Sequence, residues 1–346
     1  MKTGPKHTAS PAPVACRTTQ TVASLAFQGW QTAPMRNFFS GLTDTFSPIF
    51  CGLVLGVSSF FCSALFAQVN PGALAESGAE ALREKQASLV GQLASNPFAR
   101  PLVLESSETN SMVKGNAYAV IDAPFGTVGA TLKSPKRWCD VMILHINTKY
   151  CRAASDAAQS VLDVYVGKKS EQALADAFAL AFSFRVVASG PDYLSVQLNA
   201  DKGPLGTSDY RIELRAIPLP EGKTFMHLRY SYAYGLTGRL AMQGYLATVG
   251  SGKVGFTQIG QGAKPVYVTG IRGTVERNTM RYYLAIDAYL AALSVPAGQQ
   301  VNTRFERWFD ATEHYPLQLH EVDRASYLSM KKMEYQRQQA AAGSSG

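Results

Sequence analysis

The sequence predicts an α+β domain in which a long antiparallel sheet carries a long helix on its apolar face. Residues 149–234 alternate apolar and polar side chains in segments separated by turn sequences, as in strands joined by hairpins. After the last of these segments, residues 268–293 repeat apolar side chains at helical spacing. The strands share one apolar face and the helix has a wide one, so we expect these faces to pack together.

The segment that precedes this domain has the pattern of a secretory signal. Residues 47–67 contain no charged side chain, follow Arg36 and end in the small residue Ala67. We expect a signal peptide over about residues 35–67, cleaved after Ala67 or, as a second choice, after Ala75. The apolar stretch is also long enough to span a bilayer, so an uncleaved membrane anchor is the alternative, and a cytosolic protein is a third. The first two interpretations place residues 68–346 outside the cytoplasm, either periplasmic or secreted.

Beyond this signal the chain keeps two cysteines, Cys139 and Cys151. An even pair in an oxidising compartment predicts one disulfide, and two buried thiols are the alternative. The single long spacing, with His145 between the cysteines, differs from the paired short spacings of zinc sites. We therefore expect no metal, and no motif indicates another cofactor.

The domain begins with a helix and a strand. Residues 73–94 place leucines at roughly helical spacing, and Asn96-Pro97 ends that helix. From about residue 102 the period changes to two, and residues 112–121 are a strand candidate.

A pair of helical segments comes next. Asp122 is the expected N-cap of the first, with Pro124 in its first turn. Pro135 ends this segment, and a second helical turn with Trp138 follows.

Six further strands complete the sheet, and their outer face is expected to meet water. They are expected over 149–154, 161–167, 178–188, 193–200, 210–217 and 224–234. Turn sequences such as Gly190-Pro191-Asp192 separate them. Residues 235–262 are rich in glycine, so we expect no long helix there.

The C-terminal part of the chain is expected to be helical. The helix over 268–293 covers the sheet, and Pro296 follows its end. Residues 294–336 are expected to form a helical appendage packed on the core, with a partner-docking arm as the alternative. The predicted organisation is an N-terminal extension with signal or anchor (1–67), an N-terminal helix (68–100), the α+β domain (101–293), the appendage (294–336) and a disordered tail (337–346).

This order of elements resembles the START-like, or helix-grip, superfamily, which includes lipid-transfer START domains, Bet v 1-like plant proteins and aromatase/cyclases. The resemblance covers about residues 100–293 and rests on the strand over 112–121, the helix entry at Ala123-Pro124-Phe125, the six-strand run and the helix over 273–293. It is architectural and involves no diagnostic motif. It implies a curved sheet that grips the C-terminal helix around an elongated apolar cavity, with a lipid, sterol or polyketide as ligand.

The composition excludes several classes of protein. Of the 346 residues, 46% are hydrophobic and 17% are charged, which is typical of a globular chain and excludes a disordered or coiled-coil protein. The net charge is +8, but Lys2, Lys6, Arg17, Arg36 and Asp44 in the leader account for +3 of it. The rest is diffuse and lacks the basic stripe of a nucleic-acid binder. It is compatible with transient contact with an anionic membrane.

The candidate ligand site lies where the apolar faces meet. The cavity-wall candidates are Phe182, Phe184, Met226, Leu228, Tyr230 and Tyr232 from the strands, with Tyr282 and Ile286 from the helix. An ordinary aromatic core is the alternative interpretation of the same residues. Arg277 and Arg281 stand four apart on the helix and are candidates for anchoring a polar head group, with a structural salt bridge as the alternative.

The sequence favours a binding protein over an enzyme. It contains no Gly-x-Ser-x-Gly motif, and its histidines have no ligand spacing. We expect an exported protein that carries a lipid or other hydrophobic ligand in an apolar cavity. The alternatives are an enzyme of the cyclase or dehydratase type on the same fold and an envelope interaction protein with a filled core. A hollow and a filled interior use the same residue types, so the sequence does not separate them.

Overall fold

The structure is a computed structural model that describes residues 71–155, 160–248, 252–260 and 264–343, together with Met1. The expected signal segment lies outside the described residues. From residue 71 onward they belong to one compact unit, Phe66–Gly346. Within the described part of the chain, no helix combines the length and apolarity needed to cross a membrane.

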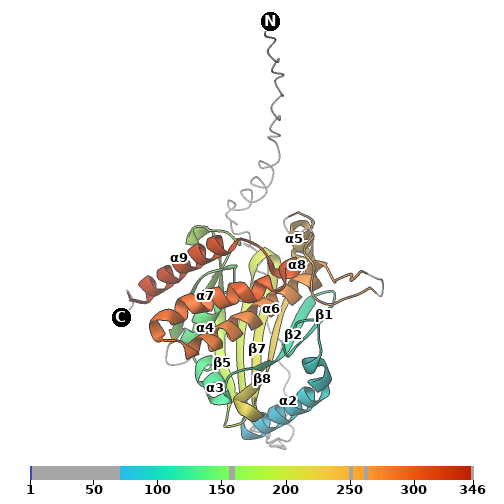
Figure 1. Cartoon of the computed structure of the whole chain (residues 1–346), viewed down its shortest axis with the longest axis vertical. Coiled ribbons are helices and arrows are strands. Elements are labelled where there is room, and N and C mark those ends of the chain that lie inside the picture. Colours follow the sequence, from blue (N-terminus) through green and yellow to red (C-terminus); the bar gives the residue numbers. More distant parts are fainter. Residues whose placement is uncertain (2–70, 156–159, 249–251, 261–263, 344–346) are drawn as a thin grey trace, which may run out of the picture. The chain divides into compact units, whose positions relative to one another are not determined.

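An antiparallel sheet of eight strands forms the framework (Figure 1). Its strands are β1 (Leu102–Glu108), β2 (Met112–Ile121), β3 (Thr148–Ser155), β4 (Ser160–Val166), β5 (Phe178–Ser189), β6 (Leu194–Lys202), β7 (Thr207–Leu219) and β8 (Lys223–Tyr234). The spatial order is β1-β2-β8-β7-β6-β5-β4-β3. The strand over 112–121 and the six later strands are confirmed, and β1 extends the sheet by a hairpin.

The pairing register of the strands places the side chains of the inner face in rows that run across the sheet. Leu228 pairs with Leu214 on β7 and Ala117 on β2. Two residues further along β8, Tyr230 pairs with Ile212 and Gly115. The inner face is therefore aliphatic toward the start of β8 and aromatic toward its end.

Helix α6 (Gly270–Ala291) is the long helix that covers this face, and it packs over β1, β2 and β8. A glycine is required where it crosses β2, because a Cβ atom on Gly115 would lie 2.2 Å from the Thr279 hydroxyl. Val275, Met280 and Ile286 on α6 are fully buried in the same core. The α+β fold with a long C-terminal helix on the sheet is thus confirmed.

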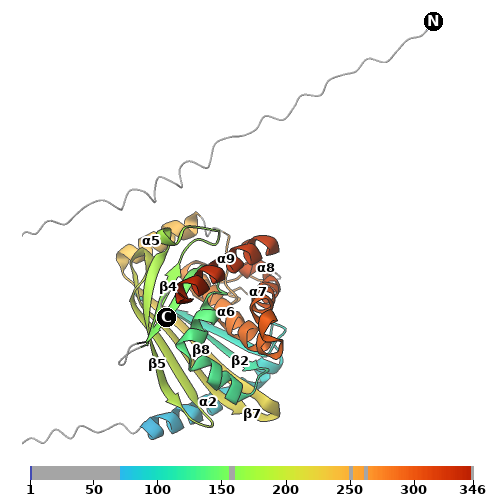
Figure 2. The ribbon, with the colours of Figure 1, turned by 90° about the vertical axis from the view of Figure 1, so that its left-hand side faces the viewer.

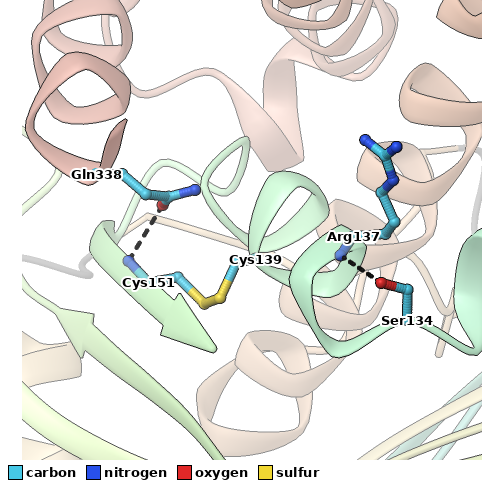
Figure 3. Close-up of a disulfide and its surroundings, with 5 residues drawn as sticks. All are labelled: Ser134, Arg137, Cys139, Cys151 and Gln338. Carbon is cyan, nitrogen blue, oxygen red and sulfur yellow. Dashed lines mark hydrogen bonds between the residues drawn. A yellow bond between two sulfur atoms is a disulfide. The ribbon is translucent and has the colours of Figure 1, made fainter. Parts of the chain in front are cut away.

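The two helices between β2 and β3 close one end of the interior. They are α3 (Phe125–Leu132) and α4 (Pro135–Met142). The predicted N-cap was wrong for α3, because the helix starts one residue after Pro124 and has no side-chain cap. Ser134 instead caps α4 by accepting a hydrogen bond from the backbone of Arg137 (Figure 3).

The cysteines form the predicted disulfide. It joins Cys139 on α4 to Cys151 on β3, with 5.2 Å between the Cα atoms (Figure 3). The backbone N–H of Cys151 also donates to the side-chain oxygen of Gln338, at 3.2 Å. The bridge therefore lies beneath the last helix of the chain.

The outer face of the sheet is partly covered, which corrects the expectation of a fully hydrated face. Helix α2 (Pro71–Ala94) lies against it (Figure 1). Its buried leucines, such as Leu82 and Leu89, share a small core with Tyr118 and Phe225. Apolar side chains on the outer face of β2 and β8 require this cover.

The glycine-rich stretch contains a helix that the sequence did not predict, α5 (Leu236–Ala247). It lies at the end of the sheet where β8 finishes (Figure 2). Gly238 is needed for packing there, because a Cβ atom at this position would lie 2.8 Å from the carbonyl oxygen of Gly206. Residues 254–260 and 264–268 then pair as the two arms of a hairpin, in which Ile259 N–H donates to Val266 O at 2.8 Å.

Three C-terminal helices gather on the same side of the sheet as α6 (Figure 2). They are α7 (Ala297–Glu313), α8 (Pro316–Leu319) and α9 (Arg324–Gly343). The short 3₁₀ segments are η1 (Leu174–Asp176), η2 (Pro204–Gly206), η3 (Pro220–Gly222) and η4 (Ala292–Ser294). The expectation of a disordered tail from residue 337 was wrong up to Gly343, because α9 continues and Gln338 is buried against β3.

A buried ionic cluster holds α9 in place. Lys331 on α9 and Lys149 on β3 both contact the carboxylate of Glu334, at 2.8 and 3.0 Å. Lys331 also donates to the backbone oxygens of His145 (2.7 Å) and Thr148 (2.8 Å). Burial costs of the two ammonium groups are offset by these hydrogen bonds and by the shared carboxylate.

Candidate functional site

The structure brings the predicted cavity-wall residues into one cluster between the sheet and α6. Met226, Leu228, Tyr230, Tyr232, Phe182 and Ile286 are buried there. Phe184 and Tyr282 contact the same cluster but remain partly exposed. The cluster is thus closed at its aliphatic end and less completely closed at its aromatic end.

Tyrosine rings fill the aromatic end. The ring centroids of Tyr210 and Tyr232 lie 5.2 Å apart in a stacked arrangement. Tyr230 contacts Tyr282 on α6 at 5.3 Å and Tyr232 at 5.8 Å. Such ring contacts favour close packing, so side chains occupy the space between sheet and helix at this point.

These tyrosines are neutral phenols over the physiological range. Burial raises the pKa of Tyr210 to about 12, and its hydroxyl hydrogen-bonds to the Thr207 hydroxyl at 2.8 Å. Burial also raises the pKa of Tyr230, Tyr232 and Tyr282 above the usual value. Phenol hydroxyls in this state can orient a ligand by hydrogen bonding, whereas they do not serve as bases.

His145 is a polar side chain of this interior that the sequence reasoning missed. It belongs to the turn between α4 and β3, and its ring contacts Tyr282 with centroids 4.8 Å apart. The side chain is buried. The available signal was its position at the end of the apolar run 141–144, where a titratable side chain is expected to be buried.

The two candidate anchor arginines have different surroundings. Arg281 Nη2 lies 2.6 Å from Glu321 Oε1, and its Nη1 donates to Asn278 Oδ1 at 3.3 Å. Arg277 Nη1 donates to the backbone oxygen of Val254 at 3.1 Å. The Arg281 guanidinium is thus held in an ion pair with Glu321, whereas Arg277 fastens the hairpin to α6.

Glu276 fixes the same hairpin from a fully buried position on α6. Its carboxylate accepts hydrogen bonds from the backbone N–H groups of Phe256 (2.5 Å) and Thr257 (2.9 Å). The hydroxyls of Thr257 and Ser106 also donate to it. The base of the hairpin is rigid because four donors converge on one carboxylate.

A surface recess of about 240 Å³ opens at the aromatic end, beneath α5. It is lined by Glu108, Arg239, Gln243, Leu246, Gly270 and Ile271. Ile271 belongs to the main core, and Leu246 contacts that core while remaining partly exposed. The recess therefore reaches apolar side chains of the interior from the surface.

The comparisons with known proteins find distant structural resemblances. No protein-family model and no curated protein matches the sequence. The solved structures that it resembles include human StAR-related lipid transfer protein 5, with 11% identity, 46% of this chain and 83% of that chain covered, and a TM-score of 0.26. They also include the Zhui aromatase/cyclase from Streptomyces sp. R1128, with 14% identity, 40% and 85% coverage and a TM-score of 0.29. A conserved protein from Geobacillus kaustophilus is 13% identical, with 51% and 95% coverage and a TM-score of 0.32.

The fold follows from the topology of the chain itself. One strand (β2), two short helices, six antiparallel strands, the helix α5 and the long helix α6 succeed one another in this order. The first and last of those strands are neighbours in the sheet, and the long helix packs across them. By this order and pairing, the chain has the helix-grip fold that the START-like resemblance implied.

Proposed function

We propose that this protein binds a hydrophobic small molecule between the inner face of the sheet and α6, and that the molecule enters beneath α5. The observation that carries the proposal is the recess at the aromatic end, which Leu246 and Ile271 connect to the main core. Ligand sites are typically concave and mostly apolar, with a few polar groups that set orientation. The tyrosine hydroxyls of the interior are groups of that kind.

Binding requires the aromatic end to open, since side chains fill it. Helix α5 is suited to move, because among its residues whose burial the structure describes only Met242 and Gly238 are buried, and Leu246 is partly exposed. Its exposed residues include Leu236 and Leu240. An element with few buried apolar contacts opens at low free-energy cost.

We further propose that the protein works outside the cytoplasm. The support is the disulfide between Cys139 and Cys151, because disulfides persist in oxidising compartments. The apolar segment over 47–67 in the sequence supports export independently.

An interaction protein with a filled core is the second candidate. The observation that favours it is the close ring packing around Tyr230. An enzyme of the cyclase or dehydratase type is less well supported. The Nδ1 atom of His145 already accepts a hydrogen bond from Asn147 N–H at 3.2 Å, so this imidazole has no free lone pair to act as a base.

Native mass spectrometry and lipid extraction of the purified full chain test the proposal. We expect a reproducible bound lipid, and saturable fluorescence of the neutral apolar probe diphenylhexatriene. The Leu246→Trp variant fills the recess and should reduce probe binding, whereas Leu240→Trp on the exposed face of α5 should not. A protein without bound lipid that shows no saturable probe binding would overturn the proposal and favour the filled-core alternative. Intact mass before and after reduction tests the disulfide in the same sample.

A further inference from the structure

The recess beneath α5 has one acidic and one basic side chain in its lining. Glu108 comes from the end of β1, and Arg239 comes from the first turn of α5. Gln243 and Leu246 follow Arg239 at a spacing of three to four residues, so one side of α5 lines the recess. The lining therefore combines charges of both signs with an amide and an apolar side chain.

The two charges of the recess do not neutralise each other. Among the residues that the structure describes, neither Glu108 nor Arg239 takes part in an ion pair, although both line one recess of about 240 Å³. The buried Tyr234 hydroxyl donates to Glu108 at 3.3 Å and to the backbone oxygen of Thr109 at 2.7 Å, which ties the carboxylate to the sheet. The carboxylate and the guanidinium thus face the recess from two different elements.

The phenol of Tyr234 shows that both charges act at the same place. Burial, followed by the negative charge of Glu108, raises the pKa of Tyr234, whereas the positive charge of Arg239 opposes the rise. The two charges are therefore close enough to act on one side chain. A ligand that meets both of them needs a positive and a negative group that are only a few atoms apart.

The recess becomes apolar toward the interior. Glu108 and Gln243 are exposed, whereas Arg239 is half-buried. Leu246 is also half-buried, and Ile271 is only 5% exposed within the main core. Polar groups thus lie at the rim and apolar groups at the floor, which is the order that an amphiphile requires. A volume of about 240 Å³ is below the roughly 300–1,000 Å³ of sites that enclose a drug-sized ligand, so the recess accommodates a head group and the tail continues inward.

The start of α6 adds to the favourable field for a negative group. Gly270 is the first residue of this helix and lines the recess. The N-cap residue Thr269 makes no side-chain hydrogen bond to the first turn. A Cβ atom on Gly270 would meet no atom within 4 Å, so the helix start is open. Backbone N–H groups without a cap favour an anion, which supplements the guanidinium of Arg239 and leaves Glu108 for a positive group.

We propose that the recess is a head-group site for a zwitterionic amphiphile, in which Arg239 and the start of α6 bind a phosphate and Glu108 binds an ammonium group. The acyl chain passes Leu246 and Ile271 and enters the interior. An amphiphile with a single negative charge leaves Glu108 without a partner, and a neutral one leaves both charges without partners. This inference rests on the proposed function and assigns the polar group of its ligand.

The test compares three amphiphiles that share an oleoyl chain, each below its micelle-forming concentration. They are the zwitterionic lysophosphatidylethanolamine, the anionic lysophosphatidylglycerol and the neutral monoolein. We expect the zwitterion to bind the full chain at least about tenfold more tightly than either of the others, since charge-assisted hydrogen bonds are stronger than neutral ones.

Two substitutions separate the roles of the two charges. Glu108→Gln keeps an acceptor for Tyr234 but removes the charge, and it should abolish the preference for the zwitterion over the anionic amphiphile. Arg239→Gln should instead reduce the preference for the zwitterion over monoolein. Arg185→Gln is the matched control, because it removes an exposed positive charge on β5 and should leave all three affinities unchanged. Glu108 and Arg239 lie at the rim, so both variants are expected to fold, and circular dichroism checks this.

Each outcome separates the head-group site from the proposed function. Equal affinities of the unaltered protein for the three amphiphiles overturn the head-group site and leave the hydrophobic site standing. Absence of binding of all three, together with absence of diphenylhexatriene binding, overturns both. A preference for the zwitterion that survives both substitutions overturns the assignment to Glu108 and Arg239. Free phosphoethanolamine should compete poorly, and competition as strong as that of lysophosphatidylethanolamine would show that the site takes a small zwitterion and overturn the assignment to an amphiphile.

Discussion

Helices α9 and α5 both lie outside the sheet and α6, but they are attached in opposite ways. Helix α9 buries Tyr327, Lys331 and Glu334 against β3 and the turn before it. On α5, Met242 is the one buried apolar side chain among residues whose burial the structure describes, and Leu240 is 61% exposed. The contrast shows that α9 is held by buried contacts, and the exposure of α5 supports the proposal that the interior opens on that side.

Removing the carboxylate beneath α9 should have the largest effect. Glu334→Gln leaves the ammonium groups of Lys149 and Lys331 buried without their shared countercharge. We expect a loss of about 3–5 kcal/mol in the free energy of unfolding, because an uncompensated buried charge is strongly unfavourable. Urea denaturation measures it. Glu306→Gln on the exposed face of α7 is the control and should change stability by less than about 0.5 kcal/mol. Equal effects of the two variants would show that α9 does not depend on this cluster.

Removing the disulfide should cause the second largest loss in the free energy of unfolding. Replacing Cys139 and Cys151 with alanine should cost about 3 kcal/mol, since the bridge spans 12 residues and restricts the unfolded chain. Hydrogen exchange should show the loss near β3 and the end of α9, where Gln338 accepts from Cys151 N–H, and not in α5. An equal loss of amide protection in α9 and α5 would contradict the view that the disulfide stabilises the α9 side of the molecule in particular.

The free energy of unfolding should also depend on pH through α9. The effect should be smaller than those of the two substitutions above, and Lys331 fixes its sign. Burial lowers the pKa of Lys331 to about 8, although Glu334 opposes the shift. Between pH 8 and the pKa of a lysine in the unfolded chain, Lys331 is protonated in the unfolded state and mostly neutral in the folded state. The free energy of unfolding therefore rises with pH over this range. From pH 7 to pH 9 we expect a gain of about 1 kcal/mol relative to Lys331→Met, in which the gain is absent.

The adjacent Lys332 provides the control for that measurement. Its side chain is exposed, so Lys332→Met should leave the pH dependence of the unfolding free energy unchanged. A gain with pH that is equal in the Lys331→Met and Lys332→Met proteins would exclude Lys331 as its source.

The sequence predicted the sheet and α6 well because their patterns are local. Alternation along β8 placed Tyr230 and Tyr232 on the inner face, where the structure also has them. The same alternation rule, applied to the outer face, led to the expectation of a hydrated surface and did not predict that α2 covers part of it. Phe225 and Ile217 break the polar pattern of the outer face, and α2 lies on them.

Tertiary contacts account for what the sequence did not predict. The glycine-rich residues 235–262 were expected to form no long helix, but Gly238 allows the backbone of α5 to approach Gly206. The alanine- and glutamine-rich end of α9 resembles a disordered tail, but Gln338 satisfies a backbone N–H on β3. His145 depends on Asn147 for its tautomer and on α6 for its surroundings, and only the fold brings α6 to it.

The smallest expected effect on stability belongs to the exposed face of α5. Leu236 and Leu240 are 77% and 61% exposed, so they contribute little to folding. The double variant Leu236→Asn/Leu240→Asn should change the free energy of unfolding by less than about 0.5 kcal/mol. Met242→Ala, on the buried face of the same helix, should cost about 2 kcal/mol. If the double variant instead costs as much as Met242→Ala, the leucines have partners in solution and α5 is held more firmly than its burial indicates. With stability unchanged, weaker binding of the double variant to anionic lipid vesicles would assign these leucines to a transient membrane contact, with which the diffuse positive charge is compatible, because exposed apolar side chains partition into the interface.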